Sequence, residues 1–447
     1  MKIRTLYMAM LFISPAGLAL SAGENNKNID LTHVISDYRI SLTSLPLDYS
    51  LLEKKQRPGV MLQRFNLNSQ TWSPQGVVSP ERWQNGVDIY IPDSAREKNA
   101  LVVINNGSNN NGSGTPVAPT NFNEEELSRY QDASLHIPMA ASVSQAFRLA
   151  KKELTQQNIN KFIVTGASKR GWAAWLTALS DPDVGAVVPF AMDLLNTQKS
   201  LEHMYQSYGK NWPVAFYPYY NQGIDQQVGT DKFARLMRLE DPLTYLNTDM
   251  GDRLKIDKYI INASGDDFYV PDNSHFYYGL LPGSKSLRVV PNSTHNGILS
   301  VAEQSLITFV NRFQEKQKLP EITENVQSRG DGKKELVVNF SEKPVAILQW
   351  TARNPAARDF RYACDIKYNS VPVSLATGDN TLSISLTTPD SGWQATYIEA
   401  TFTDGYVATT QVYITPDEKY PETAPPSIDA SCQTLPGRGL SPTPVKQ

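Results

Sequence analysis

The sequence predicts an α/β domain with a mostly parallel central sheet and helices on both faces, followed by a small β-sandwich-like domain. Between residues 100 and 320, short apolar runs alternate with helical patterns, and their connections are short. Such runs are typical of parallel strands, which need helical crossovers and are covered on both faces. From Glu335 onward, apolar and polar residues alternate in short segments separated by turn residues, which is typical of antiparallel strands in a sandwich.

Length and charge limit the classes of protein to consider. The chain has 447 residues, which is enough for a large core and more than one domain. Its 42 basic and 45 acidic residues nearly balance, so nothing points to a nucleic acid or an anionic membrane as a partner. No pattern indicates a metal or an organic cofactor, and the sequence does not define the oligomeric state.

The first 22 residues are typical of a cleaved secretory signal peptide. Lys2 and Arg4 precede an apolar run over residues 6–20, which ends in small residues. This run is short for a membrane span and contains a proline and a glycine, so we expect no stable membrane span after cleavage. The mature protein is therefore expected to be exported.

We assign residues 23–320 to the α/β domain. Its first part, residues 24–58, is polar and weakly patterned, with a short helix expected around residues 31–38. Two runs at residues 59–66 and 86–92 alternate as half-buried antiparallel strands do. Continuous apolar runs predict buried strands at residues 100–104, 162–165, 184–190, 258–263 and 287–291. A further strand is expected over residues 134–138, with helices over residues 141–154 and 297–316.

Residues 195–255 interrupt the alternation of strands and helices. They contain a tryptophan, several prolines and six tyrosines. Ligands bind outside the carboxyl ends of the strands in open α/β sheets. We therefore expect this segment to be a cap inserted over that end of the sheet.

The C-terminal part is expected to be structural or adhesive. Residues 330–416 carry the period-two strands but no cluster of histidines or acidic residues, and residues 417–447 form a Pro-rich, extended tail. Cys364 and Cys432 are the only cysteines of the chain. An oxidising compartment would let them form a disulfide, and the alternative is two unpaired buried thiols.

A turn around Ser168 is the first candidate for chemistry. The strand that ends in Gly166-Ala167-Ser168 is followed by a helical pattern rich in small residues. This is typical of the nucleophile elbow, in which a serine lies on a strained strand-to-helix turn. The second glycine of the G-x-S-x-G pattern is displaced, since Arg170 takes its place and Gly171 follows. The alternative is an ordinary turn whose serine caps the helix.

A base and an acid follow the last two strands of the predicted sheet. A serine nucleophile needs a base to accept its proton and an acid to orient that base. His295 follows the last strand and Asp266 and Asp267 follow the one before it, which is the chain order of the α/β-hydrolase fold. Because the strands are parallel, their loops meet at one end of the sheet.

The identity of the acid stays open. The Asp-x-x-Val-Pro pattern common in this fold selects Asp267, whereas Asp266 directly follows a glycine. Asp193, after an earlier strand, is a weaker third candidate. In the alternative interpretation these aspartates are turn residues or form a cation site with Asp272, although the spacing matches no calcium loop, and His295 caps the last helix.

The oxyanion hole is expected to use backbone N–H groups. One donor would be Lys169, directly after the serine, and the other would come from Gly107 or Ser108. These two lie in a loop over residues 105–114 that contains only Asn, Gly and Ser. Lys169 and Arg170 could bind an acidic group of the substrate or form buried ion pairs, and we favour the structural role for Arg170.

Four motifs carry a resemblance to a known family. They are Thr-Gly-Ala-Ser-Lys-Arg-Gly-Trp at residues 165–172, Gly-Asp-Asp-Phe at residues 265–268 with Pro-Asp at residues 271–272, Asp-Pro at residues 241–242 ahead of Tyr245, and Val-Pro-Asn at residues 290–292 before His295. Together they resemble the PhoPQ-activated pathogenicity-related protein family. The resemblance covers about residues 30–415.

The resemblance implies an exported bacterial protein with an α/β-hydrolase fold and a role at the cell surface or in virulence. It implies no substrate. The family's Gly-Asp followed by a second acid keeps Asp266 as a candidate for the triad acid. One departure concerns the oxyanion loop, where Asn-Asn-Gly at residues 105–107 replaces the expected Thr-Gly-Gly-like segment.

We therefore expect a periplasmic or secreted serine hydrolase. Ser168 would attack a small-molecule ester, in preference to a peptide, with His295 as base and Asp266 or Asp267 as acid. The alternative is a hydrolase-fold binding or signalling protein without turnover, which the irregular elbow would suit. Catalysis predicts that Ser168 Oγ and His295 Nε2 lie within about 3.5 Å of each other, allowing for loose geometry without substrate.

Overall fold

The computed structural model describes residues 31–73, 80–95, 98–105, 134–329, 333–376 and 378–440. From Thr32 onward these residues belong to one compact unit. The predicted signal peptide and the predicted oxyanion donors Gly107 and Ser108 lie outside the described residues. No helix of the described residues is long and apolar enough to cross a membrane.

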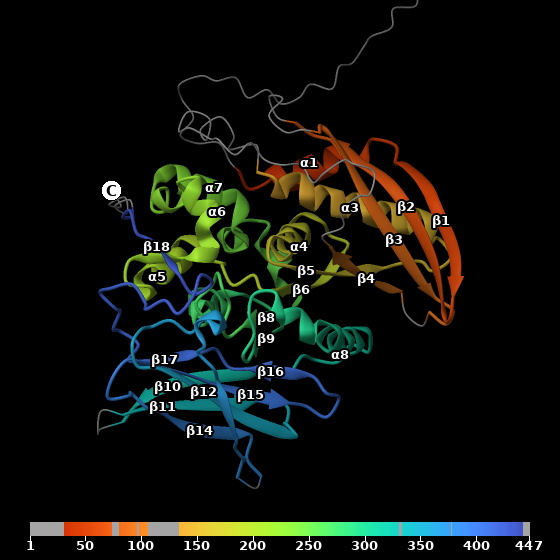
Figure 1. The fold of residues 1–447 in the computed structure, drawn as a ribbon. Coiled ribbons are helices and arrows are strands. Elements are labelled where there is room, and N and C mark those ends of the chain that lie inside the picture. The colour runs from red at the N-terminus through yellow and green to blue at the C-terminus, as the bar shows by residue number, and fades with distance from the viewer. Residues whose placement is uncertain are drawn as a thin grey trace, which may run out of the picture. The chain divides into compact units, whose positions relative to one another are not determined.

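A five-stranded parallel sheet forms the centre of the first domain (Figure 1). Its strands, in spatial order, are β4 (Asn99–Ile104), β5 (Lys161–Ala167), β6 (Val184–Phe190), β8 (Asp257–Ala263) and β9 (Lys285–Val290). All four pairings are parallel. The Val- and Ile-rich runs of the sequence thus form the predicted strands, and their parallel order confirms the predicted fold class.

The strands alternate between two apolar layers, because successive side chains of a strand point to opposite faces. Phe162 and Val164 of β5 join a core with the helices α3 (His136–Glu153) and α4 (Lys169–Ser180). Ile163 between them joins a second core with Phe309 of α8 (Ala302–Gln314). Helices therefore cover both faces, as the continuous apolar runs predict.

Three local expectations were wrong. β4 is the edge strand of the described sheet, and Leu101 and Val103 are exposed, so an apolar run alone did not establish a central position. The expected strand at residues 134–138 is the first turn of α3, where Pro138 is tolerated because first-turn N–H groups have no intrahelical acceptor. The expected helix at residues 297–316 begins as a 3₁₀ turn, Gly297–Val301, before α8.

An antiparallel sheet precedes the parallel one. It consists of β1 (Asp48–Arg57), β2 (Val60–Thr71) and β3 (Arg82–Pro92), and α1 (Val34–Thr43) comes before it. The two alternating runs form β2 and β3 as predicted, whereas β1 was missed because its sequence is mostly polar. A turn at Pro58 and Gly59 joins β1 to β2, and Gly59 supplies the positive φ of 75° that such a turn needs.

The segment predicted as a cap is mainly helical. Between β6 and β8 it forms α5 (Thr197–Ser207), β7 (Asn211–Pro213), α6 (Tyr217–Asn221) and α7 (Asp231–Glu240), with 3₁₀ turns between and after them. The indole of Trp172 in α4 donates a hydrogen bond to the carbonyl of Glu240 at the end of α7. His136 stacks on that indole and pairs with the Glu240 carboxylate at 2.7 Å. These contacts fix the inserted segment to the helix that follows Ser168.

Two antiparallel sheets make up the C-terminal domain. One contains β10 (Ile322–Ser328), β11 (Lys334–Phe340) and β14 (Thr381–Leu386). The other contains β13 (Asn369–Pro372), β12 (Ala346–Asn354), β15 (Trp393–Thr401) and β16 (Val407–Thr409), with β17 (Tyr413–Thr415) also paired to β15. Inward residues such as Val338 and Ile398 share one apolar core with Ile261 of the parallel sheet.

The tail returns to the inserted segment. Residues 434–436 form β18 (Thr434–Pro436), which pairs antiparallel with β7 so that Leu435 lies opposite Trp212. Cys364 and Cys432 form the predicted disulfide, with Cα atoms 4.9 Å apart. The tail is therefore attached both to the inserted segment and to the C-terminal domain.

Candidate active site

Ser168 lies at the turn between β5 and α4 in a strained backbone conformation. Its φ of 57° and ψ of −129° fall in a region that residues with a Cβ rarely adopt. Such a residue costs about 1–3 kcal/mol and persists only where the surrounding structure enforces it. The backbone is held by hydrogen bonds from Ser168 N to Phe190 O at 2.8 Å and from Trp172 N to Ser168 O at 3.0 Å.

Both glycines of the turn are closely packed, Gly166 more tightly than Gly171. A Cβ on Gly166 would lie 2.6 Å from the carbonyl oxygen of Arg170, which no real side chain tolerates. A Cβ on Gly171 would lie 3.0 Å from Gly166 O and 3.1 Å from the Cβ of Met192. The displaced second glycine therefore has a packing reason at its own position.

The hydroxyl of Ser168 does not cap the helix. Ser168 occupies the N-cap position of α4, but its side chain accepts no hydrogen bond from the first turn. This excludes the alternative in which the serine is a simple capping residue. Lys169 is the first residue of α4, so its backbone N–H has no intrahelical acceptor and stays available to a ligand.

Asp266 is the aspartate that binds the ring of His295. His295 Nδ1 lies 2.9 and 3.0 Å from the two carboxylate oxygens of Asp266, and both side chains are buried. Asp266 also accepts hydrogen bonds from Phe268 N at 2.7 Å and Tyr269 N at 3.3 Å. Asp267 instead accepts a hydrogen bond from the backbone N of His295 at 3.3 Å. The two neighbouring aspartates thus hold different parts of one histidine.

The other acidic candidates have different partners. Asp193 is buried and accepts a hydrogen bond from Tyr277 Oη at 2.6 Å, and burial raises its pKa well above the usual value. Asp272 pairs with Arg358 at 2.5 Å and with His203 at 3.0 Å. These pairings explain its buried charge without a cation.

The charges around His295 favour its protonated form. Burial lowers its pKa, but the charge and hydrogen bond of Asp266 and the charge of Asp267 outweigh burial, and the net direction is upward. The nearby guanidinium of Arg170 acts in the opposite direction. The ring centroids of Phe268 and Tyr269 lie 4.7 and 5.9 Å from the imidazole centroid of His295.

The structure does not join Ser168 to His295 by a hydrogen bond within the described residues. β5 and β9 are separated by two strands, which corresponds to about 14 Å at the usual strand spacing. The His295 loop therefore has to reach back across β8 and β6. Arg170, in the first turn of α4, is close enough for its charge to act on His295. Hydrogen bonds between catalytic groups are often long without substrate and tighten when it binds.

The expected ion pair of Arg170 is not found among the described residues. Its guanidinium has only a long hydrogen bond, 3.4 Å to Ala167 O, and burial lowers its pKa. Lys169 is exposed. Both cations directly follow the serine in the chain. Our preference for a structural ion pair at Arg170 has no support among the described residues.

Comparison with known proteins identifies the family. A model of the PhoPQ-activated pathogenicity-related protein family matches residues 35–129 and 120–361. The chain belongs to this family. Autocrine proliferation repressor protein A of Dictyostelium discoideum is 27% identical over 400 residues, covering 76% of this chain and 80% of that protein.

Two acetyl xylan esterase structures are distantly similar to this member of the PhoPQ-activated family. The enzyme of Paenibacillus sp. R4 is 13% identical, covering 65% of this chain and 96% of its own, with a TM-score of 0.45. That of Thermoanaerobacterium sp. JW/SL YS485 is 15% identical, covering 62% and 92%, with a TM-score of 0.43.

Sequence reasoning missed the contacts that the C-terminal part makes with the site of this PhoPQ-activated family member. Tyr362 and Tyr368 contact the loops that carry Asp266 and His295. No local signal in the sequence marks these tyrosines, because their partners lie far away in the chain. Asn292 and Tyr368, for example, are 76 residues apart. The family match ends at residue 361, just before them.

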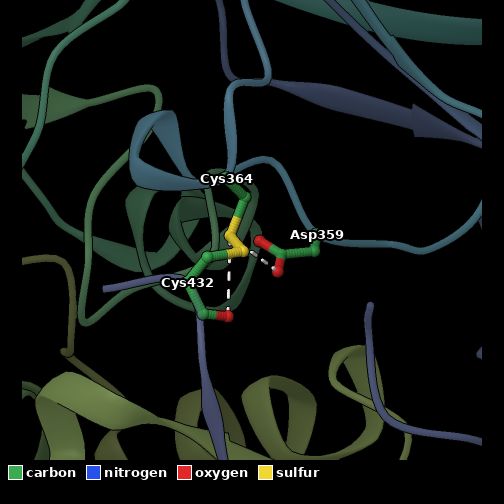
Figure 2. A group of neighbouring side chains, drawn as sticks. All are labelled: Asp359, Cys364 and Cys432. Atoms are coloured by element: carbon green, nitrogen blue, oxygen red, sulfur yellow. Dashed lines mark hydrogen bonds between the residues drawn. A yellow bond between two sulfur atoms is a disulfide. The ribbon is translucent and has the colours of Figure 1, made fainter. Parts of the chain in front are cut away.

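The buried group around the disulfide is not a metal site in its oxidised form. Asp359 lies beside Cys364 and Cys432 (Figure 2), with Asp359 Oδ2 3.4 Å from the Cys364 sulfur. A metal would bind thiolates, whereas the two sulfurs here are joined to each other. Because a disulfide sulfur carries no hydrogen, its approach to Asp359 is a contact and not a hydrogen bond.

Proposed function

We propose that this protein is an exported serine hydrolase that cleaves small-molecule esters. Two observations carry the proposal: the pairing of Asp266 with His295, and a strained serine at the turn after β5 whose hydroxyl makes no capping bond. Strained φ/ψ angles and a buried carboxylate on a histidine are both costly, and they occur together where a nucleophile is activated.

The proposed chemistry gives each of the three side chains one role. His295 Nε2 accepts the proton of Ser168 Oγ while the oxygen attacks the acyl carbon. Asp266 on Nδ1 fixes the tautomer that leaves Nε2 as the acceptor and stabilises the imidazolium that forms. The imidazolium then donates its proton to the departing alcohol, and a water activated in the same way releases the acid from Ser168.

The negative charge on the carbonyl oxygen would be stabilised by backbone donors. Lys169 N–H at the start of α4 is one of them, and the dipole of this helix favours an anion at its N-terminus. The second donor would come from Gly107 or Ser108. Esters are proposed before amides because the carbonyl of an ester is less stabilised by resonance, and an alkoxide leaves more readily than the anion of an amine.

Export is part of the proposal. Lys2 and Arg4 before an apolar run favour a signal peptide, and the disulfide between Cys364 and Cys432 suits an oxidising compartment. The family name adds a setting at the bacterial surface or in virulence. A periplasmic or secreted location accounts for all three features.

The alternative is a hydrolase-fold protein that binds a partner without turnover. It is favoured by one observation, namely that Ser168 and His295 form no hydrogen bond within the described residues. The two functions differ in whether the serine is nucleophilic, so reactivity distinguishes them directly.

The test is labelling of the mature protein by a fluorophosphonate probe. We expect labelling of the wild type, loss of labelling in Ser168→Ala and His295→Ala, and normal labelling in the control Ser44→Ala, which changes an exposed serine after α1. Labelling that persists in Ser168→Ala would assign the reactivity to another residue. The pH range of about 6 to 9 covers the conversion of a histidine to its neutral, basic form. A folded wild type that does not react with the probe anywhere in this range would refute hydrolysis and favour binding.

A further inference from the structure

We propose that residues 355–368 of the C-terminal domain, the loop between β12 and β13, position both loops of the proposed catalytic site. This bridging loop contacts the residue before Asp266 on one side and a residue three positions before His295 on the other. The inference rests on the proposed function, because it assigns the loop the task of aligning the acid and the base. Asn292, Tyr362 and Tyr368 would then be positioning residues.

The first contact holds the loop of Asp266. Tyr362 N donates a hydrogen bond to Gly265 O at 3.1 Å. The two backbones are so close that a Cβ on Gly265 would lie 2.6 Å from Tyr362 N. Gly265 N in turn donates to Ser293 O at 3.1 Å, which links the acid loop to the histidine loop. Only glycine permits this approach, so the backbone of Asp266 is set by the bridging loop.

The second contact holds the loop of His295. The side chain of Asn292 donates from Nδ2 to Tyr368 O at 2.9 Å and accepts at Oδ1 from Tyr368 N at 2.7 Å. This reciprocal pair imitates a strand pairing between two irregular segments. Asn292 has a φ of 52°, a left-handed conformation that asparagine tolerates better than most residues. Its backbone N also donates to Ser264 Oγ at 3.0 Å.

A third contact holds the far end of the acid loop. Arg358 of the bridging loop pairs with Asp272 at 2.5 Å and donates to Ser207 Oγ of α5 at 2.7 Å. Both charged side chains are buried, so removing one partner would leave an uncompensated charge. The acid loop is thus attached to the bridging loop before Asp266 and after Asp267.

The bridging loop is itself fixed by the tail. Buried Arg361 pairs with Asp359 at 2.7 Å and donates to the carbonyls of Cys432 at 2.8 Å and Gln433 at 3.0 Å. The disulfide of Cys364 lies at the same place (Figure 2). These contacts give the loop a rigid support, which the alignment of catalytic groups to within about 0.5 Å requires.

The test compares Asn292→Gly with a matched control. Glycine removes the amide pair with Tyr368 but keeps the left-handed backbone accessible. Asn158→Gly is the control, because Asn158 also has a positive φ, 46°, but is exposed and lies before β5 at the opposite end of the sheet. Asn292→Asp keeps the Oδ1 acceptor for Tyr368 N but turns a second acceptor towards Tyr368 O, so it also breaks the reciprocal pair.

Two readouts are needed, and one does not depend on turnover. The chain has five histidines, so an NMR titration resolves His295, with His295→Ala assigning its signal. The charged groups that act on His295 are Asp266, Asp267 and Arg170. If Asn292→Gly displaces the ring from the two aspartates, the pKa of His295 falls and the acid limb of labelling moves to lower pH. The second readout is the labelling rate, expected to fall about tenfold or more.

The outcomes separate the two proposals. A lower pKa of His295 and slower labelling in Asn292→Gly, with a folded protein and an unchanged Asn158→Gly, support the positioning role. An unchanged pKa and rate in Asn292→Gly would overturn it, and so would equal changes in the control. If Asn292→Gly does not fold, the labelling rate of Asn292→Asp decides, because its new carboxylate would itself raise the pKa of His295. A wild type that never labels, but whose His295 pKa responds to Asn292→Gly, would refute hydrolysis while retaining the positioning role.

Discussion

Removing the disulfide between Cys364 and Cys432 is expected to destabilise the protein strongly. The bond closes a loop with a sequence separation of 68 residues. In the chain-entropy model, a loop of this length reduces the entropy of the unfolded chain by about 15 cal/mol/K, which corresponds to about 4 kcal/mol at 25 °C. The double variant Cys364→Ala/Cys432→Ala should therefore unfold at a markedly lower urea concentration.

The assay is equilibrium unfolding in urea followed by tryptophan fluorescence. Wild type with its disulfide reduced is the control, because it keeps both sulfur atoms and loses only the covalent bond. The double variant and the reduced wild type should show the same shift of the urea midpoint, apart from the small effect of losing two sulfur atoms from the packing. A double variant whose midpoint equals that of the oxidised wild type would refute the reasoning, since it would show that the bond does not restrict the unfolded chain.

Three further predictions follow from the site and the core. Asp266→Asn should lower kcat by about four orders of magnitude because the histidine loses its orienting charge. Asp267→Asn should lower kcat by less than about tenfold. Steady-state kinetics on an ester measure both values, and equal losses would contradict the assignment of Asp266 as the acid. Gly166→Ala places a Cβ 2.6 Å from a backbone oxygen and should abolish labelling and lower stability, while Gly279→Ala, which has open space, should be neutral in both assays. Burial lowers the pKa of Lys258 to about 7. Between that pH and about 10.5 the unfolded state binds more protons than the folded state, so stability rises with pH. Lys258→Met should remove this slope in unfolding measured from about pH 6 to about pH 10, and a slope that persists would contradict the prediction.

The positions of Ser168, Asp266 and His295 could be predicted because each follows an apolar run that is visible in the sequence. A parallel sheet brings the ends of such strands together, so chain order alone placed the three residues at one edge. The choice between Asp266 and Asp267 could not be made in this way. Both follow the same strand, and only the direction of each carboxylate in the folded loop separates them.

Longer-range features were beyond sequence reasoning. The polar strand β1 forms because β2 offers it a partner, and its own residues carry no alternation. β4 is apolar but lies at the edge of the described sheet. The contacts of Tyr362 and Tyr368 depend on a second domain whose β-rich character was predicted but whose loops carry no pattern. For the two tyrosines, a partner far along the chain decides the outcome.

The pairing of β18 with β7 places a constraint on biosynthesis. It puts Leu435 opposite Trp212, so the segment between β6 and β8 gains its partner strand only when almost the whole chain exists. At about 5–20 residues per second, the ribosome needs roughly 10–45 s to cover that interval. During this time Trp212, which is fully buried in the final fold, has no tail to cover it. Trp212 therefore gains its contact with β18 well after its own segment has been made.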